Sequence, residues 1–123
     1  MTQTTRILTV DDSASMRALL RHALTQQGFE IEQAEDGVAA LEWLQANEVD
    51  VVITDINMPR MDGFGLIEAL RSGERHQGRP ILVLTTESSD EKKQRARTAG
   101  ATGWIVKPFD AEKLAAAVRR VAH

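Results

Sequence analysis

Short apolar runs and longer amphipathic segments alternate along the chain from one end to the other. Four apolar runs have the length of a strand: Ile7–Val10, Val51–Ile53, Ile81–Leu84 and Trp104–Val106. A fifth segment, Phe29–Ala34, alternates apolar and polar residues as FEIEQA. Continuous apolar runs are typical of strands covered on both faces, whereas alternation is typical of a half-exposed strand. The pattern therefore predicts five strands, with 29–34 at an edge of the sheet.

Each predicted strand is followed by a helical pattern. The first has apolar positions at Met16, Leu19, Leu20, Ala23 and Leu24. Capping and helix-ending residues predict the boundaries: Gly28 ends the first helix, Asp36 caps the second, Gly63 and Gly73 flank the third, and Asp110 begins the fifth. Trp43 is expected to pack within the second helix.

The fourth helical segment, SSDEKKQRARTAG, differs from the others. Ser88 and Glu91 have the spacing of a capping box, but only Ala96 and Ala99 face the core. Little apolar burial predicts a weakly held, mobile helix. Two interpretations stay open: a solvated helix, or a surface that shifts when something binds.

Alternating strands and helices predict an α/β fold with one parallel sheet and helices on both faces, joined by right-handed crossovers. With 123 residues, the chain is expected to form a single domain over 1–123. A net charge of −3, without a basic run, argues against nucleic-acid binding. Cysteine is absent, no apolar run reaches membrane length and the N-terminus lacks a signal-peptide pattern. We expect a cytoplasmic, monomeric protein that binds no membrane.

Polar residues follow the predicted strands at their carboxyl ends, where ligands bind in open α/β sheets. They are Asp11, Asp12, Asp55, Thr85 and Lys107. Three neighbouring carboxylates repel one another, and Mg²⁺ with a few carboxylates and waters would relieve this repulsion. The Asp11–Asp12 pair alone is equally typical of a helix cap before Ser13; the third carboxylate favours the metal site. Metal, ammonium and hydroxyl groups together suit phosphoryl transfer to a carboxylate.

Together, the Asp11-Asp12 pair and the segments TDINMPRMDG, LTTES and WIVKPF resemble the receiver domain of two-component response regulators across essentially the whole chain. The resemblance implies a doubly wound, flavodoxin-like sheet with strand order 2-1-3-4-5 and five helices. It implies that Asp55 is the phosphoacceptor and that Asp11, Asp12, Asp55 and the backbone carbonyl of Asn57 are the Mg²⁺ ligands. It also implies that Thr85 and Lys107 bind the phosphoryl group. Thr85 and Trp104 would be the switch residues, and Pro108 a cis-proline.

Within this family the chain is similar to the stand-alone chemotaxis regulators, the CheY type, because no further domain follows the fifth helix. Asn57 and Glu87 match positions that modulate phosphoryl lifetime. The implied partners are a chemotaxis histidine kinase as phosphodonor, the flagellar motor switch protein as target and a phosphatase. The target would bind the fourth helix, fifth strand and fifth helix. Such a protein is not an enzyme in the ordinary sense; it catalyses only its own phosphorylation and dephosphorylation.

Several alternatives are open. A stand-alone receiver also serves as a phosphate sink or a non-chemotactic regulator, and a degenerate receiver only binds partners. A phosphatase of the haloacid dehalogenase type needs a second aspartate two residues after the nucleophile, where this chain has Asn57. A flavodoxin-like cofactor binder needs a phosphate loop after the first strand, which is lacking. His22, His76 and His123 have no metal-ligand spacing and are expected at the surface.

Overall fold

A computed structural model describes residues 4–122, which form a single five-stranded sheet covered by helices. The strands are β1 (Arg6–Val10), β2 (Glu30–Ala34), β3 (Val51–Thr54), β4 (Ile81–Thr85) and β5 (Gly103–Val106). The helices are α1 (Ala14–Gln26), α2 (Gly37–Leu44), α3 (Gly63–Ser72), α4 (Asp90–Ala99) and α5 (Ala111–Val121). All ten predicted elements are present, with boundaries within about two residues of the sequence pattern.

All neighbouring strands are parallel, and their order is β2-β1-β3-β4-β5. β2, the alternating strand, lies at an edge as predicted, and β5 forms the other edge. Val10 of β1 pairs with Thr54 of β3, so the next residues, Asp11 and Asp55, leave the sheet side by side. Thr85 of β4 pairs with Val106 of β5, which places Lys107 at the same edge. The register therefore assembles the predicted polar residues at one rim.

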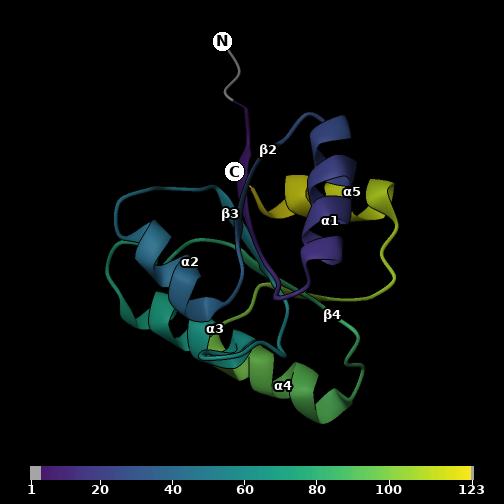
Figure 1. Ribbon diagram of the computed structural model, residues 1–123. Helices are drawn as coiled ribbons and strands as arrows, with labels where there is room; N and C mark the ends of the chain where they lie inside the picture. Colours follow the sequence, from purple (N-terminus) through teal and green to yellow (C-terminus); the bar gives the residue numbers. More distant parts are fainter. Residues whose placement is uncertain (1–3, 123) are drawn as a thin grey trace.

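The helices cover both faces of the sheet (Figure 1): α1 and α5 lie on one face, and α2, α3 and α4 on the other. Each face has its own hydrophobic core. Leu20, Leu24, Leu114 and Val118 fill the first, and Leu44, Phe64, Leu66 and Ile67 fill the second. Both sides of the central strands β1, β3 and β4 are thus buried, which explains their uninterrupted apolar sequence.

Two details of the helices differ from the prediction. Leu19 is 57% exposed, because Leu20 and Leu24, four residues apart, face the sheet and turn Leu19 outward. The fourth helix is capped by Ser89 instead of Ser88: its side chain accepts a hydrogen bond from the backbone N–H of Lys92. Asp36, Asp62 and Asp110 cap α2, α3 and α5 in the same manner.

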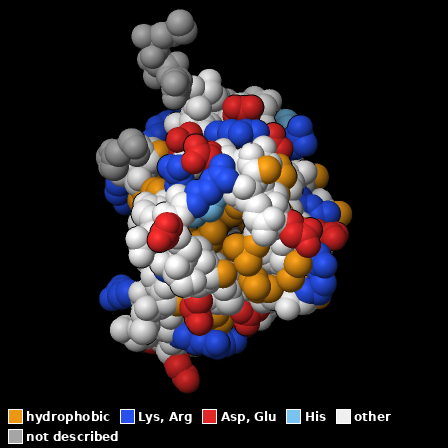
Figure 2. All heavy atoms as spheres, turned by 90° about the vertical axis from the view of Figure 1, so that its left-hand side faces the viewer, with side chains coloured by type: hydrophobic (Ala, Val, Ile, Leu, Met, Phe, Trp, Pro, Cys, Tyr) orange, Lys and Arg blue, Asp and Glu red, His pale blue; other side chains and the backbone are white. Residues whose placement is uncertain are grey.

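The expectation for the histidines is wrong at one position. His22 is exposed, whereas His76 is buried, and His123 lies outside the described residues. The imidazole Nε2 of His76 lies 3.0 Å from the carbonyl oxygen of Leu44 at the end of α2. Figure 2 shows a hollowed hydrophobic patch where α2 and α3 meet. Its lining includes Leu41, Leu44, Ala69, Leu70 and His76. His76 therefore helps to join the loop after α3 to α2.

Helix α4 is the most polar helix, and only Ala96 is fully buried in it. Two arginines nevertheless connect it with α3. The guanidinium of Arg95 lies 4.0 Å from the ring centre of Phe64, and Arg71 donates a hydrogen bond of 2.9 Å to the carbonyl of Gly100.

Along residues 4–122, none of the helices combines the length and apolar character that crossing a membrane requires.

Candidate functional site

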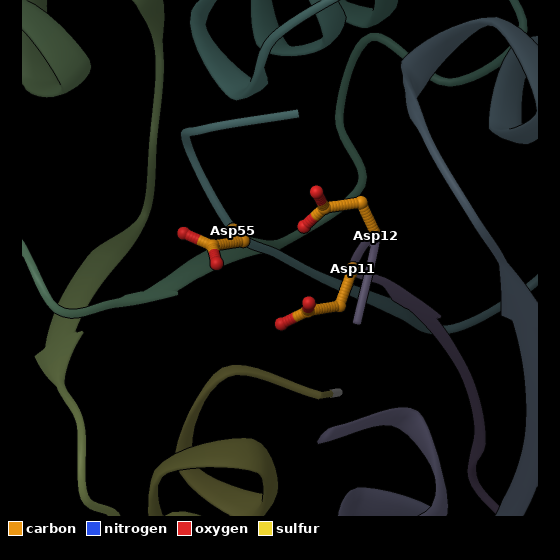
Figure 3. Close-up of side chains that lie close together, drawn as sticks. All are labelled: Asp11, Asp12 and Asp55. Atoms are coloured by element: carbon orange, nitrogen blue, oxygen red, sulfur yellow. The ribbon is translucent and has the colours of Figure 1, made fainter. Parts of the chain in front are cut away.

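The carboxylates of Asp11, Asp12 and Asp55 converge at the carboxyl edge of the sheet (Figure 3). One oxygen from each lies within 4.8 Å of the other two. Asp11 and Asp55 continue adjacent strands, and the backbone N–H of Asp55 donates to the carbonyl of Val10 at 2.9 Å. Asp11 is buried, Asp55 is half-buried and Asp12 is exposed. The sheet register thus forces these like charges together and leaves one side of the cluster open to solvent.

Lys107 lies between two of these carboxylates. Its ammonium Nζ is 2.8 Å from Oδ2 of Asp55 and 2.9 Å from Oδ2 of Asp11. Burial acts to lower the pKa of Lys107, but the hydrogen bonds and negative charges of Asp55 and Asp11 outweigh it and raise this pKa above its usual value. The Lys107–Pro108 peptide bond is cis, in agreement with the prediction. The lysine is therefore charged and held directly beside the carboxylate of Asp55.

The cluster fits a divalent metal ion. Lys107 supplies one positive charge against three carboxylates, and two unit charges about 4 Å apart near a surface interact by about 4 kcal/mol. Carboxylate and carbonyl oxygens with an open, solvated side are the ligands that Mg²⁺ prefers. Asp11, Asp12 and Asp55 would hold the ion, and the receiver resemblance adds the backbone carbonyl of Asn57, two residues after Asp55. Asp12 is the most accessible of the three carboxylates.

Thr85 is fully buried at the end of β4, and its hydroxyl accepts a hydrogen bond of 3.3 Å from the backbone N–H of Glu87. The backbone carbonyl of Thr85 accepts a hydrogen bond of 2.8 Å from the backbone N–H of Lys107. The indole Nε1 of the half-buried Trp104 donates to the carbonyl of Glu87 at 3.1 Å. The segment after β4 therefore connects Thr85 with Trp104 through two hydrogen bonds to the backbone of Glu87.

The side chain of Glu87 joins the loop after β3 to α4. It accepts a hydrogen bond of 3.2 Å from the Asn57 side chain and pairs with Lys92 at 2.9 Å. These two groups, Lys92 first, lower the pKa of Glu87. Both predicted lifetime-modulating residues, Asn57 and Glu87, are thus in contact beside Asp55. Lys92 was not among the predicted residues, since a lysine in an exposed helix has no distinguishing sequence signal.

A second ion pair near the site was also missed. Arg60 contacts the buried Asp36 through two hydrogen bonds of 2.8 and 3.0 Å. The guanidinium of Arg60 and the backbone N–H of Ala39 lower the pKa of Asp36. From the sequence, Asp36 is a helix cap and Arg60 a loop residue 24 positions away. Only the tertiary structure brings them together.

Comparison with known proteins agrees with this geometry. The family profile of the response regulator receiver domain matches residues 7–119. Chemotaxis protein CheY of Pseudomonas aeruginosa is 37% identical over 117 residues, which cover 94% of each chain. Chemotaxis protein CheY-3 of Vibrio cholerae is 40% identical over 110 residues, covering 89% of this chain and 85% of the relative.

Solved structures show the same similarity. The structure of Vibrio cholerae chemotaxis protein CheY4 superposes with a TM-score of 0.92 at 46% identity, covering 97% of this chain and 99% of the other. A putative response regulator from Chloroflexus aurantiacus superposes with a TM-score of 0.93 at 29% identity and covers 98% of both chains. The family match, the chemotaxis-protein relatives and the shared fold lead to one conclusion: this chain belongs to the response regulator receiver domain family.

Proposed function

We propose that this protein is a single receiver domain over 1–123 that is phosphorylated on Asp55 in a Mg²⁺-dependent reaction. The observation that carries this proposal is the cluster of Asp11, Asp12 and Asp55 with Lys107 bonded to two of its members. Phosphoryl transfer needs positioning and charge neutralisation more than covalent chemistry from the protein. An acidic, partly open rim with one fixed ammonium provides both.

In the proposed reaction, a carboxylate oxygen of Asp55 attacks phosphorus while the bond from phosphorus to the nitrogen of a histidine kinase's phosphohistidine breaks. Mg²⁺, when bound, neutralises charge on the phosphoryl oxygens. Lys107 already contacts Asp55 and binds the new phosphoryl group as a point charge. The hydroxyl of Thr85 exchanges its contact with the Glu87 amide for a contact with that group. The protein thereby catalyses its own phosphorylation and, by admitting water, its own dephosphorylation.

Phosphorylation would then change the binding surface formed by α4, β5 and α5. Both Thr85 and the Trp104 indole are hydrogen-bonded to the backbone of Glu87. Movement of Thr85 therefore shifts this backbone, and the ring of Trp104 turns inward. The ion pair between Glu87 and Lys92 transmits the same shift to α4. The phosphoryl group acts by favouring one of two conformations through contacts made in that state only.

For the pathway, we propose chemotaxis in the cytoplasm, with a chemotaxis histidine kinase as donor, the flagellar motor switch protein as target and a phosphatase that ends the signal. Support comes from relatives named as chemotaxis proteins at 37–40% identity. The alternative is a phosphate sink or a non-chemotactic regulator. A peptide of the motor switch protein distinguishes them: a target role requires that binding strengthens on phosphorylation, whereas a sink binds the peptide equally weakly in both states.

The Asp55→Asn variant tests the acceptor. We expect no phosphorylation by acetyl phosphate with Mg²⁺, because the amide is not a nucleophile, while circular dichroism remains unchanged. Asp62→Asn is the matched control, since Asp62 lies in the same loop but caps α3, a role that asparagine fills nearly as well. Phosphorylation of Asp55→Asn at the wild-type rate would refute the assignment. Chelation of Mg²⁺ is expected to stop the reaction in the wild type, and hydrolysis of a generic phosphomonoester would favour the phosphatase alternative.

A further inference from the structure

The loop between β3 and α3 contains a residue in an unfavourable backbone conformation. Arg60 has a φ of +64°, the only positive φ of a non-glycine residue in the described part of the chain. In this left-handed region Cβ crowds the backbone, and glycine is the residue that adopts it without cost. An arginine persists at such a position only when surrounding contacts hold it there.

Those contacts come from Asp36, the capping residue of α2. Nε of Arg60 lies 2.8 Å from Oδ2 of Asp36, and Nη2 lies 3.0 Å from Oδ1. Asp36 is only 3% exposed, and Oδ1 also accepts the backbone N–H of Ala39 at 2.9 Å. A two-pronged contact of this kind fixes orientation as well as distance, which a lysine cannot do.

A backbone contact lies directly beside this ion pair. The N–H of Gly37 donates to the carbonyl of Met61 at 3.3 Å. A Cβ at position 37 would lie 2.7 Å from Cγ of Met61, so the two segments are in close van der Waals contact. The start of α2 therefore holds the 60–61 part of the loop through both side chain and backbone.

The same loop carries Asp55 and Asn57, two of the residues proposed for the metal site. It begins at Asp55, and the N–H of Gly63 closes its base on the carbonyl of Ile56 at 2.8 Å. Between these points, Asn57 is held on one side by its contact with the partly exposed Glu87. On the other side, the turn is held by Asp36 and Gly37. The loop segment with Asn57 is thus held at one end by Glu87 and, three residues later, by the pair between Arg60 and Asp36.

We propose that Asp36 and Arg60 are positioning residues for phosphorylation: they fix the turn that carries the Asn57 carbonyl and so set Mg²⁺ affinity and phosphorylation rate without contacting metal or phosphate. This inference rests on the proposed function of the same site. The left-handed Arg60 backbone gives the turn its direction, and the ion pair keeps it there.

Four variants of the full chain test the proposal. Asp36→Asn keeps the α2 cap but removes the negative charge. Arg60→Ala removes the ion pair but keeps the unfavourable free energy of the left-handed backbone at position 60. Arg60→Gly removes both the ion pair and that unfavourable free energy. Asp110→Asn is the matched control, because Asp110 caps α5 through the amide of Lys113 just as Asp36 caps α2. For each variant we would measure Mg²⁺ affinity by calorimetry, the rate of phosphorylation by acetyl phosphate, stability in urea and, without metal, hydrogen exchange of the Gly37 amide.

We expect Asp36→Asn and Arg60→Ala to bind Mg²⁺ roughly tenfold more weakly, the lower end of the loss when groups that orient metal ligands are removed. Arg60→Gly should lose less Mg²⁺ affinity than Arg60→Ala, and Asp110→Asn should keep the wild-type Mg²⁺ affinity. The Gly37 amide should exchange its hydrogen faster in Asp36→Asn than in the wild type. Wild-type affinity in both Asp36→Asn and Arg60→Ala, or an equal loss in Asp110→Asn, would overturn the positioning role while leaving the proposed function intact. A wild-type protein that binds no Mg²⁺ would overturn both.

Discussion

Lys107 and its two aspartates illustrate how single residues acquire their properties at this site. The Lys107 side chain, directly after β5, is only 10% exposed, yet its pKa lies above the usual value since Asp55 and Asp11 oppose the effect of burial. Breaking a buried ion pair by removing one partner costs about 3–5 kcal/mol, because the other charge stays unpaired. Asp11 is 2% exposed, so removal of Lys107 would leave its buried side chain without this ion-pair partner. The stability of this cluster therefore depends on Lys107 and both aspartates together.

The pH dependence of stability should reveal Asp36. Its folded pKa lies below the ordinary value of about 3.9, so its charged form stabilises the fold above about pH 4 and that contribution is lost as the pH falls through the lower folded value. Asp36→Asn lacks the contribution at every pH. The difference in the free energy of unfolding between wild type and variant, measured in urea, is therefore expected to be largest near neutrality and to shrink in acid. A difference that grows in acid would contradict this assignment.

Gly63 should not tolerate a side chain. A Cβ there would overlap the backbone oxygen of Asp55 and lie 2.9 Å from Cα of Ile56, both at the start of the loop between β3 and α3. Gly63→Ala is expected to destabilise the protein by about 1–3 kcal/mol, as for other overpacked sites. Gly78→Ala is the control, because a Cβ at Gly78 meets nothing within 4 Å. Urea unfolding of both variants decides the matter, and equal stabilities would disprove the steric explanation.

At the scale of elements, the strands were the most predictable part of the molecule. Their apolar runs are uninterrupted, and β1 and β3 are each followed directly by an aspartate of the site. The helices could be predicted from apolar spacing and capping residues. The prediction was wrong in detail where two neighbouring residues were equally suited to the same role. Leu19 and Leu20 both continue the stripe of α1, and only contact with the sheet selects Leu20. Ser88 and Ser89 are both capping residues, and the backbone path out of β4 selects Ser89.

The cap of α4 can be tested directly. Ser89→Ala removes the acceptor for the Lys92 amide and is expected to cost about 1 kcal/mol of stability. Ser88→Ala should change stability by less than about 0.5 kcal/mol, the usual range for an exposed residue without a special role. Hydrogen exchange of the α4 amides would confirm that the loss is local to this helix. A larger effect at Ser88 would restore the original capping-box prediction.

At the scale of the molecule, the parallel sheet is what makes a site from distant residues. Positions 11, 55 and 107 directly follow three strands, and their side chains meet since parallel strands place their carboxyl ends at one edge. The two hydrophobic cores, one on each face, hold those strands in register. Any loss of register would therefore separate Asp11, Asp55 and Lys107.

The proposed single domain predicts one cooperative unfolding transition. Trp43 of α2 and Trp104 of β5 report on different parts of the molecule, and far-ultraviolet circular dichroism reports on all helices. In a two-state domain these signals change at the same urea concentration. Single-tryptophan variants, Trp43→Phe and Trp104→Phe, separate the two fluorescence signals. Transitions with different midpoints would mean that the part around one tryptophan unfolds independently.

The sequence by itself determined the element order, the parallel α/β fold and which polar residues meet at the carboxyl edge of the sheet, because strand periodicity and strand-end polar residues are local signals. The resemblance to receivers supplied the strand order and the cis bond before Pro108, and both are present in the structure. Tertiary structure alone decided the contacts between Asp36 and Arg60, between Glu87, Asn57 and Lys92, and around the buried His76. These contacts join residues from separate loops and helices, and charged or polar side chains leave no periodic pattern by which a sequence reveals its distant partners.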